Sequence, residues 1–171
     1  MALPFSDANV ILARLIEQFG TDIYRLARSI VSDEALANDV VQETLLRAWG
    51  SMDRWPEGDV PRAWLLKVAR NQAISMLRKR RDEPMAPESL TNVATSDRST
   101  ADVVNDRVAV ERFWAALESL DPQTRSIVVM REISDLSYEE ISEVLNLPLP
   151  TVKTRLFRAR RKLQTILEEW K

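Results

Sequence analysis

"LSYEEISEVLNLPLPTVKTRLFRARRKL", residues 136–163, decides the fold class of this chain. Ser137 and Glu140 have the spacing of a capping box, which starts a helix, and the residues after Ser137 place their apolar side chains on one face. "NLPLP" ends that helix, because Asn146 tolerates the left-handed backbone of a tight turn and Pro150 suits the first turn of a new helix. Two short helices joined by a tight turn predict a helix-turn-helix.

The second of these helices carries six Lys or Arg residues and no acid between Lys153 and Lys162. A solvated face that complements the helix dipole would give the same charge run. A helical wheel places a core stripe on Val152, Leu156, Ala159 and Leu163, flanked by Arg155, Arg160 and Lys162. The outward side carries Thr154, Phe157, Arg158 and Arg161, with Lys153 at its shoulder. The outward aromatic and the absence of acids favour binding in the DNA major groove. Only the outward set is expected to read DNA.

The composition excludes several kinds of chemistry. The 171 residues contain no Cys and no His, so disulfides, thiol chemistry, His-based catalysis and the usual zinc sites are absent. With three glycines there is no Gly-rich phosphate loop, and the carboxylate pair Glu139 and Glu140 is explained by the start of a helix. We therefore expect no enzyme, no cofactor, no metal and no small-molecule substrate.

The first twenty residues do not resemble a targeting segment. Asp7, Arg14 and Glu17 interrupt their apolar pattern, and no apolar run in the chain approaches the ~20 residues that a membrane span needs. The expectation is a cytoplasmic protein without membrane insertion.

A change of composition divides the chain. Residues 82–106 combine two prolines with scattered Ser, Thr, Asn and Asp, whereas apolar residues recur at helical spacing on both sides. The sequence thus predicts an all-α protein of two small helical domains, 1–84 and 106–171, joined by a flexible linker, 85–105. The formal net charge is −2, from 24 basic and 26 acidic residues, and neither domain has an excess of either sign, so a nucleic-acid surface must be local.

"DEALANDVVQETLLRAW", residues 33–49, predicts a largely buried helix with a wide apolar arc that includes Trp49. The polar strip that remains consists of Asp39, Gln42, Glu43, Leu46 and Arg47. A polar strip with one apolar anchor suits a protein partner, and a solvent face with one tolerated leucine is the alternative.

"WPEGDVPRAWLLKVARNQAISMLRKRR", residues 55–81, predicts a stiff loop followed by a helix. One face of this helix is apolar, and the other carries Trp64, Lys67, Asn71, Ser75 and Arg78. An aromatic ring, an amide and cations on one stripe are the groups that bind single-stranded nucleic acid. In the alternative, the tryptophan belongs to the core and the cations are solvated.

These three stretches, in their order along the chain, resemble the extracytoplasmic-function group of sigma factors over nearly the whole chain. Residues 39–49 look like the region two helix that binds core RNA polymerase, residues 62–81 resemble the promoter-melting segment, and residues 136–163 resemble the region four helix-turn-helix. Asn146 and Pro150 stand where the family often has glycine, and both are compatible with the turn.

The resemblance implies roles for individual residues. Asp39, Gln42 and Glu43, with Leu46 and Arg47 of the same strip, would contact core polymerase. Asn71 would hold a base flipped from the minus-ten element, beside a loop at 53–62; the minus-ten set is Trp55, Arg62, Trp64, Lys67, Asn71, Ser75 and Arg78. Lys153, Thr154, Phe157 and Arg158, with Arg161 of the same outward face, would contact the minus-thirty-five element.

The function implied is that of an alternative sigma factor, which directs core RNA polymerase to specific promoters and melts the minus-ten element. Its partners would be core RNA polymerase, promoter DNA as duplex and single strand, and an anti-sigma factor. It would associate with the nucleoid when active, or be held at the membrane by the anti-sigma factor. The alternative from the residues alone is a stand-alone helix-turn-helix regulator, although such regulators usually dimerise and no dimer seam is evident.

Overall fold

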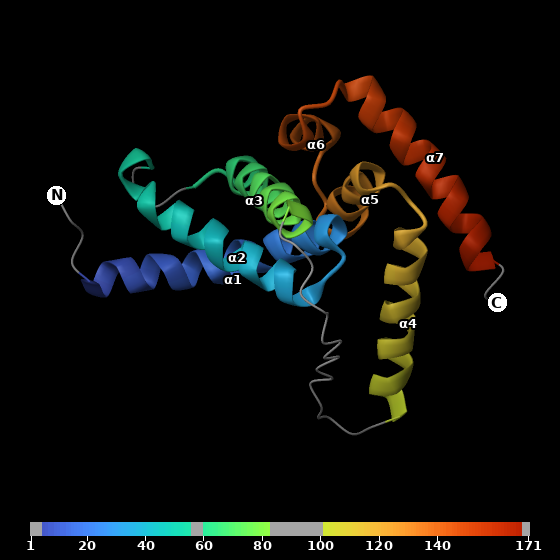
Figure 1. The fold of residues 1–171 in the computed structure, drawn as a ribbon, viewed down its shortest axis with the longest axis horizontal. Helices are drawn as coiled ribbons and strands as arrows, with labels where there is room; N and C mark the ends of the chain where they lie inside the picture. The colour runs from blue at the N-terminus through green and yellow to red at the C-terminus, as the bar shows by residue number, and fades with distance from the viewer. Residues whose placement is uncertain (1–4, 56–59, 83–100, 169–171) are drawn as a thin grey trace.

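The computed structural model describes residues 5–55, 60–82 and 101–168, and every regular element in them is helical. The predicted all-α fold is therefore confirmed. In chain order (Figure 1) the elements are α1 (Phe5–Val31), α2 (Glu34–Gly50), the 3-10 helix η1 (Met52–Arg54), α3 (Arg62–Asp82), α4 (Ala101–Glu118), α5 (Pro122–Val128), the π-helix η3 (Val129–Ile133), α6 (Tyr138–Leu145) and α7 (Leu149–Glu168).

Helices α1, α2 and α3 pack against one another and form the first group. Asp33 starts α2, because its carboxylate accepts a hydrogen bond from the backbone N–H of Leu36 at 2.9 Å. The side chains between these helices are fully buried and apolar, among them Ile23, Val40 and Leu65. Burial of such side chains, about 1.5–3 kcal/mol each, holds the group together.

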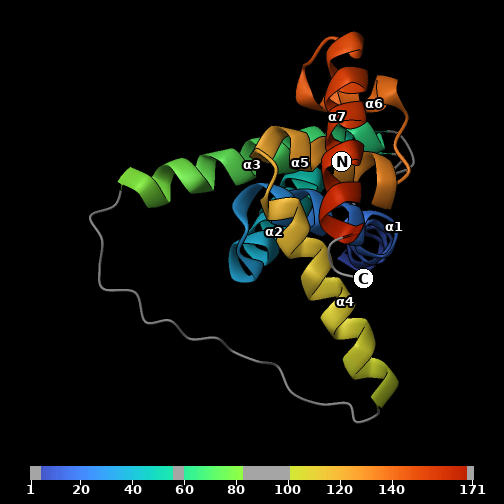
Figure 2. The same cartoon turned by 90° about the vertical axis from the view of Figure 1, so that its right-hand side faces the viewer.

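Helices α5, α6 and α7 and η3 form the second group, with Ile127, Ile141 and Leu156 in its core. Helix α4 packs on α5 and α7 through its C-terminal part only. The rest of α4 projects away from the molecule in two perpendicular views (Figures 1 and 2).

The predicted helix-turn-helix is confirmed in detail. Ser137 and Glu140 form the capping box at the start of α6, and Asn146 has the left-handed conformation, with φ of 52°. The backbone N–H of Leu147 then bonds the carbonyl of Ser142 at 3.0 Å, which satisfies the end of α6. Pro150 lies in the first turn of α7, as expected.

The two groups are in contact, which the sequence did not indicate. Helix α3 packs on α6, and α1 packs on α5 and η3. Two polar bonds cross the boundary: Arg62, which also bonds Asp22 within the first group at 2.7 Å, bonds the carbonyl of Ser134, and the Arg25 guanidinium bonds the carbonyl of Ile133 at 3.2 Å. The described residues thus form one packed unit.

Arg125 of α5 is the central cation of this boundary and is only 7% exposed. Its guanidinium donates to the carbonyls of Leu117, Glu118 and Leu120 at the end of α4, and to the Ser29 carbonyl and Ser32 hydroxyl at the end of α1. Burial lowers the pKa of Arg125 below its ordinary value. Because helix C-termini carry partial negative charge, two of them together can hold a buried guanidinium with no carboxylate bonded to it.

Three local features differ from the sequence expectations. Helix α4 begins at Ala101, so the last residues of the predicted linker are helical, while residues 83–100 lie outside the described residues. The π-helix η3 between α5 and α6 was not predicted. Trp49, predicted in the buried arc of α2, is 37% exposed. The domain limits at 84 and 106 stay a prediction.

The capping box makes stability depend on pH. A hydrogen bond from the Ser137 backbone lowers the pKa of Glu140 from its ordinary 4.5, so its contribution is present above that pH and lost as pH falls through the lower folded value. We expect Glu140→Gln to cost about 1 kcal/mol at pH 7 and less at pH 3.5. Urea unfolding at the two pH values checks this, with exposed Glu139→Gln as control. An equal cost at both pH values would contradict it.

Candidate functional site

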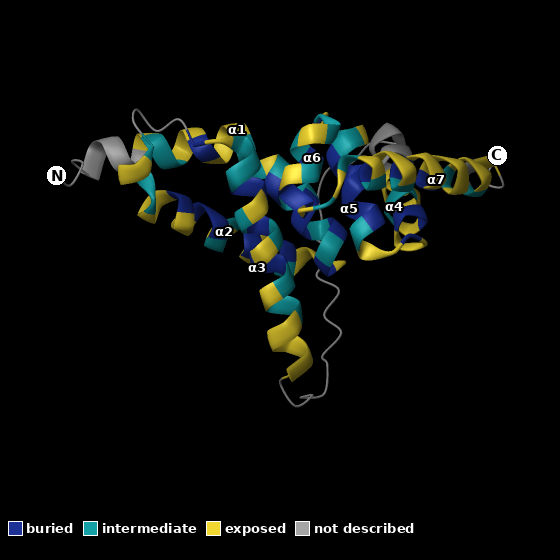
Figure 3. Cartoon of the chain, turned by 90° about the horizontal axis from the view of Figure 1, so that it is seen from above, coloured by how far each residue is buried: buried dark blue, intermediate teal, exposed yellow. Residues whose placement is uncertain are grey.

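The outward face of α7 is as the sequence predicted. Lys153, Thr154, Phe157, Arg158 and Arg161 are all exposed, while Val152, Leu156 and Ala159 are buried. Phe157 is 62% exposed, which is unusual for an aromatic side chain on a helix that already has a core stripe. The exposed row along α7 is visible in Figure 3. The residues of this face take no part in the core that α7 forms with its neighbours.

Cations next to this face are fixed by neighbours that the sequence did not reveal. The Tyr138 ring lies 5.0 Å from the Arg131 guanidinium and 5.7 Å from the Lys153 ammonium. Arg160 bonds the Glu132 carboxylate at 2.6 Å, and that bond raises the pKa of Arg160. Tyr138 thus orients Lys153, whereas the charge of Arg160 is partly neutralised.

The second candidate surface is the outward stripe of α3. Lys67, Asn71, Ser75 and Arg78 are exposed at spacings of three and four, so they share one face. Trp64 is half-buried and packs on Trp55, with ring centroids 5.7 Å apart. The stripe stays open although α3 packs on α6.

Two further members of the predicted minus-ten set, Arg62 and Trp55, are half-buried. Arg62 is half-buried and bound to Asp22 and to the Ser134 carbonyl, so it faces the second group of helices. The indole N–H of Trp55 is buried and has no hydrogen-bond partner among the described residues. The middle of the predicted loop, residues 56–59, lies outside the described residues, and its role stays a prediction.

The third surface is the outward strip of α2. Asp39, Gln42, Leu46 and Arg47 are exposed, and Glu43 is half-exposed. Leu46 is 61% exposed, and Trp49, three residues further on, extends its apolar surface. The spacing of Trp49 from Leu46 was the signal that sequence reasoning missed.

Arg47 has a positioning role within this strip. Its guanidinium bonds the Glu43 carboxylate at 3.2 Å. With its amide oxygen turned toward α2, the buried Gln72 of α3 also accepts hydrogen bonds from Arg47. Arg47 therefore orients Glu43 and joins the strip to α3.

Other kinds of site are not found in the described parts of the chain. Residues 5–55, 60–82 and 101–168 contain no group of three or more acidic side chains placed to hold a metal ion. No described helix combines the length and the apolar character that a bilayer crossing would need.

Comparison with known proteins finds a family pattern in both parts of the chain. The family model for Sigma-70 region 2 matches residues 15–83, and the model for Sigma-70, region 4 matches residues 111–163. The first includes α2 and α3, and the second includes the helix-turn-helix.

Individual relatives agree with the family models. The chain is 35% identical over 166 residues to the ECF RNA polymerase sigma factor SigL of Mycobacterium tuberculosis, covering 93% of this chain and 90% of that protein. It is 33% identical over 156 residues to the ECF RNA polymerase sigma factor SigE of Mycolicibacterium smegmatis, covering 90% of this chain but 60% of that protein.

The fold agrees as well. The sigma factor RpoE of Bartonella quintana, solved in complex with the anti-sigma factor NepR, superposes with a TM-score of 0.69 at 27% identity, over 91% of this chain and 96% of that one. The helix order, the helix-turn-helix, both family matches and the identity to SigL together show that this chain belongs to the sigma-70 family, as an ECF sigma factor.

Proposed function

We propose that this chain is an alternative promoter-specificity subunit that works through three separate surfaces. The strip of α2 around Leu46 binds core RNA polymerase, the stripe of α3 around Asn71 captures a base of the minus-ten element, and the outward face of α7 binds the minus-thirty-five duplex. Residues 1–84 act as region two and residues 106–171 as region four. The protein performs no chemistry of its own, in line with its family.

One observation carries this proposal: a single chain exposes all three surfaces at once, on helices whose opposite sides are buried. A flipped base costs a few kcal/mol of unstacking, which an amide and an aromatic side chain in a pocket can offset. An exposed aromatic between cations suits contact with a thymine methyl in the major groove. Neither domain has an excess of basic charge, so polymerase supplies much of the nonspecific affinity.

The packed arrangement implies that the two groups of helices separate in the active complex. Elements centred near minus ten and minus thirty-five are about 25 base pairs apart, roughly 85 Å of duplex. Helices α3 and α7 have 21 and 20 residues, so even placed end to end they would measure only about 60 Å. In the structure both helices pack on α6. The contacts of α3 with α6 must therefore open before one promoter can engage both surfaces.

An anti-sigma factor is the expected regulator, because RpoE of Bartonella quintana, which shares the fold, was solved with one. Such a partner would act by holding the closed arrangement or by covering the strip of α2. We place the protein in the cytoplasm, on the nucleoid when active, or at the membrane when the anti-sigma factor anchors it there.

In vitro transcription with purified core polymerase on a promoter-fragment library tests the function. We expect transcripts that start at a defined set of fragments and require this protein. The matched control is the Leu46→Asp variant, which should lose polymerase binding and transcription together because it places a charge at the apolar anchor. Transcripts that do not depend on the protein, with specific DNA binding by the protein alone, would favour the stand-alone regulator instead.

A further inference from the structure

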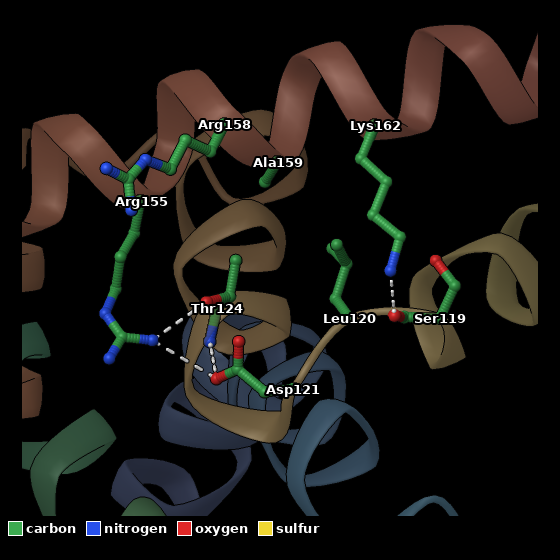
Figure 4. Close-up of a pocket in the computed structure, with 8 residues that line it drawn as sticks. All are labelled: Ser119, Leu120, Asp121, Thr124, Arg155, Arg158, Ala159 and Lys162. Carbon is green, nitrogen blue, oxygen red and sulfur yellow. Dashed lines mark hydrogen bonds and ion pairs between the residues drawn. The ribbon is translucent and has the colours of Figure 1, made fainter.

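A hollow of about 260 Å³ lies between α7 and the corner that joins α4 to α5 (Figure 4). A second hollow of about 290 Å³ adjoins it along α7 and shares Arg155 and Arg158 with it. We call this surface the flank groove and define it by Thr124, Arg155, Arg158 and Lys162. It runs beside the outward face of α7, and Arg158 belongs to both.

The cations of the flank groove are held in place across the hollow. A terminal nitrogen of Arg155 donates to the Thr124 hydroxyl at 3.0 Å and to the Asp121 carboxylate at 3.3 Å. The Lys162 ammonium reaches the Ser119 carbonyl at 2.5 Å. Figure 4 shows both side chains spanning from α7 to the corner, with the Arg158 guanidinium lying along α7 above Arg155.

These contacts leave most of the donors unused. A lysine ammonium has three donors and the guanidinium has five, whereas the bonds above engage one ammonium and one guanidinium nitrogen. Asp121 is the one carboxylate that lines the groove, and it also caps α5 through the backbone N–H of Thr124 at 3.0 Å. Burial would raise the pKa of Asp121, but the hydrogen bonds from Thr124 and the nearby Arg155 outweigh it, so the pKa lies below its ordinary value. The groove thus carries three cations and one carboxylate, and an oxygen of that carboxylate already accepts hydrogen bonds.

We propose that the flank groove binds a phosphate group of the DNA backbone on one side of the base-reading face of α7. Phosphate contacts fix the register of a protein on the duplex, whereas base contacts specify the sequence. A groove that carries net positive charge beside a reading face has the position that such a contact needs. The proposal leaves the base-reading role with the outward set of α7 and adds a backbone contact, in which Arg155 and Lys162 join Arg158.

The proposal rests on the proposed function, and the test separates the two. It measures promoter binding by the holoenzyme, assembled from this chain and core polymerase, over a range of salt concentrations. We expect Lys162→Gln to weaken binding about equally for different promoter sequences and to make the slope of log K against log salt shallower by about 0.9. Arg112→Gln, which removes one exposed charge from α4, is the matched control and should leave the slope unchanged.

A purely structural role of Lys162 would lower the melting temperature of the variant without changing the slope. An unchanged slope overturns the proposal. This holds even if inorganic phosphate alone binds the wild-type chain and not the variant, because the groove would then bind a free anion instead of DNA. Arg155→Gln gives a second reading of the same slope. If the wild-type chain directs no promoter-specific transcription, the proposed function fails first, whatever the variants do.

Discussion

Replacing Arg125 with methionine is expected to lower the free energy of unfolding by about 3 kcal/mol. The guanidinium is 7% exposed and bonds five oxygen atoms at the ends of α1 and α4. Methionine fills a similar volume but leaves carbonyl groups without donors, and each unsatisfied buried polar group costs about 1–3 kcal/mol. Relaxation and entering water recover part of that cost, so the loss is smaller than the sum of the bonds.

Urea unfolding of the full chain measures this loss. Arg112→Met on exposed α4 is the matched control, because it removes the same charge where nothing is buried, and it should change stability by less than about 0.5 kcal/mol. Arg125→Lys should lie between the two, since one ammonium cannot reach acceptors on both helices. A loss below about 1 kcal/mol for Arg125→Met would show that the bonds to the helix ends contribute little.

Replacing Asn71 with alanine is expected to reduce promoter opening by about tenfold or more, with core polymerase binding retained. An amide that bonds a base edge is worth about 1–3 kcal/mol, and tenfold corresponds to about 1.4 kcal/mol. Asn71 is exposed and lies outside the core of α3, so the fold and the strip of α2 should be unaffected.

The measurement compares opening on duplex promoters with opening on templates already melted around the minus-ten element. The defect should shrink on the melted template, because the unstacking cost that the pocket offsets is then absent. Gln164→Ala, which removes an exposed amide from α7, is the control and should open both templates normally. Loss of polymerase binding in the Asn71 variant would mean that this face of α3 belongs to the polymerase interface.

Several features of this structure could be predicted from the sequence because they depend on local signals. The capping box at Ser137 and the left-handed Asn146 depend on neighbours within a few residues, so spacing alone was sufficient. The core and outward faces of α7 followed from helical periodicity, because a helix of that length repeats its pattern several times.

Features that depend on a partner distant in the sequence could not be predicted. Trp49 was predicted to be buried because its apolar character fitted the arc of α2, yet it is 37% exposed, whereas Ala48 beside it is buried. Arg62 is bound in the structure to Asp22 and to the carbonyl of Ser134, which is 72 residues away, and its predicted contact with DNA stays a prediction. Nothing in the sequence around either residue indicates these neighbours.

The sequence by itself determined the helical class, the helix-turn-helix and the side chains that each helix turns outward, because these follow from periodicity and local capping. Only the tertiary structure decided that the two groups of helices close on each other, that Arg125 is buried between two helix ends, and that Arg155 and Lys162 line a groove. The physical reason is the same for all three: each depends on atoms brought together from remote parts of the chain, and a pattern of neighbouring residues carries no information about such contacts.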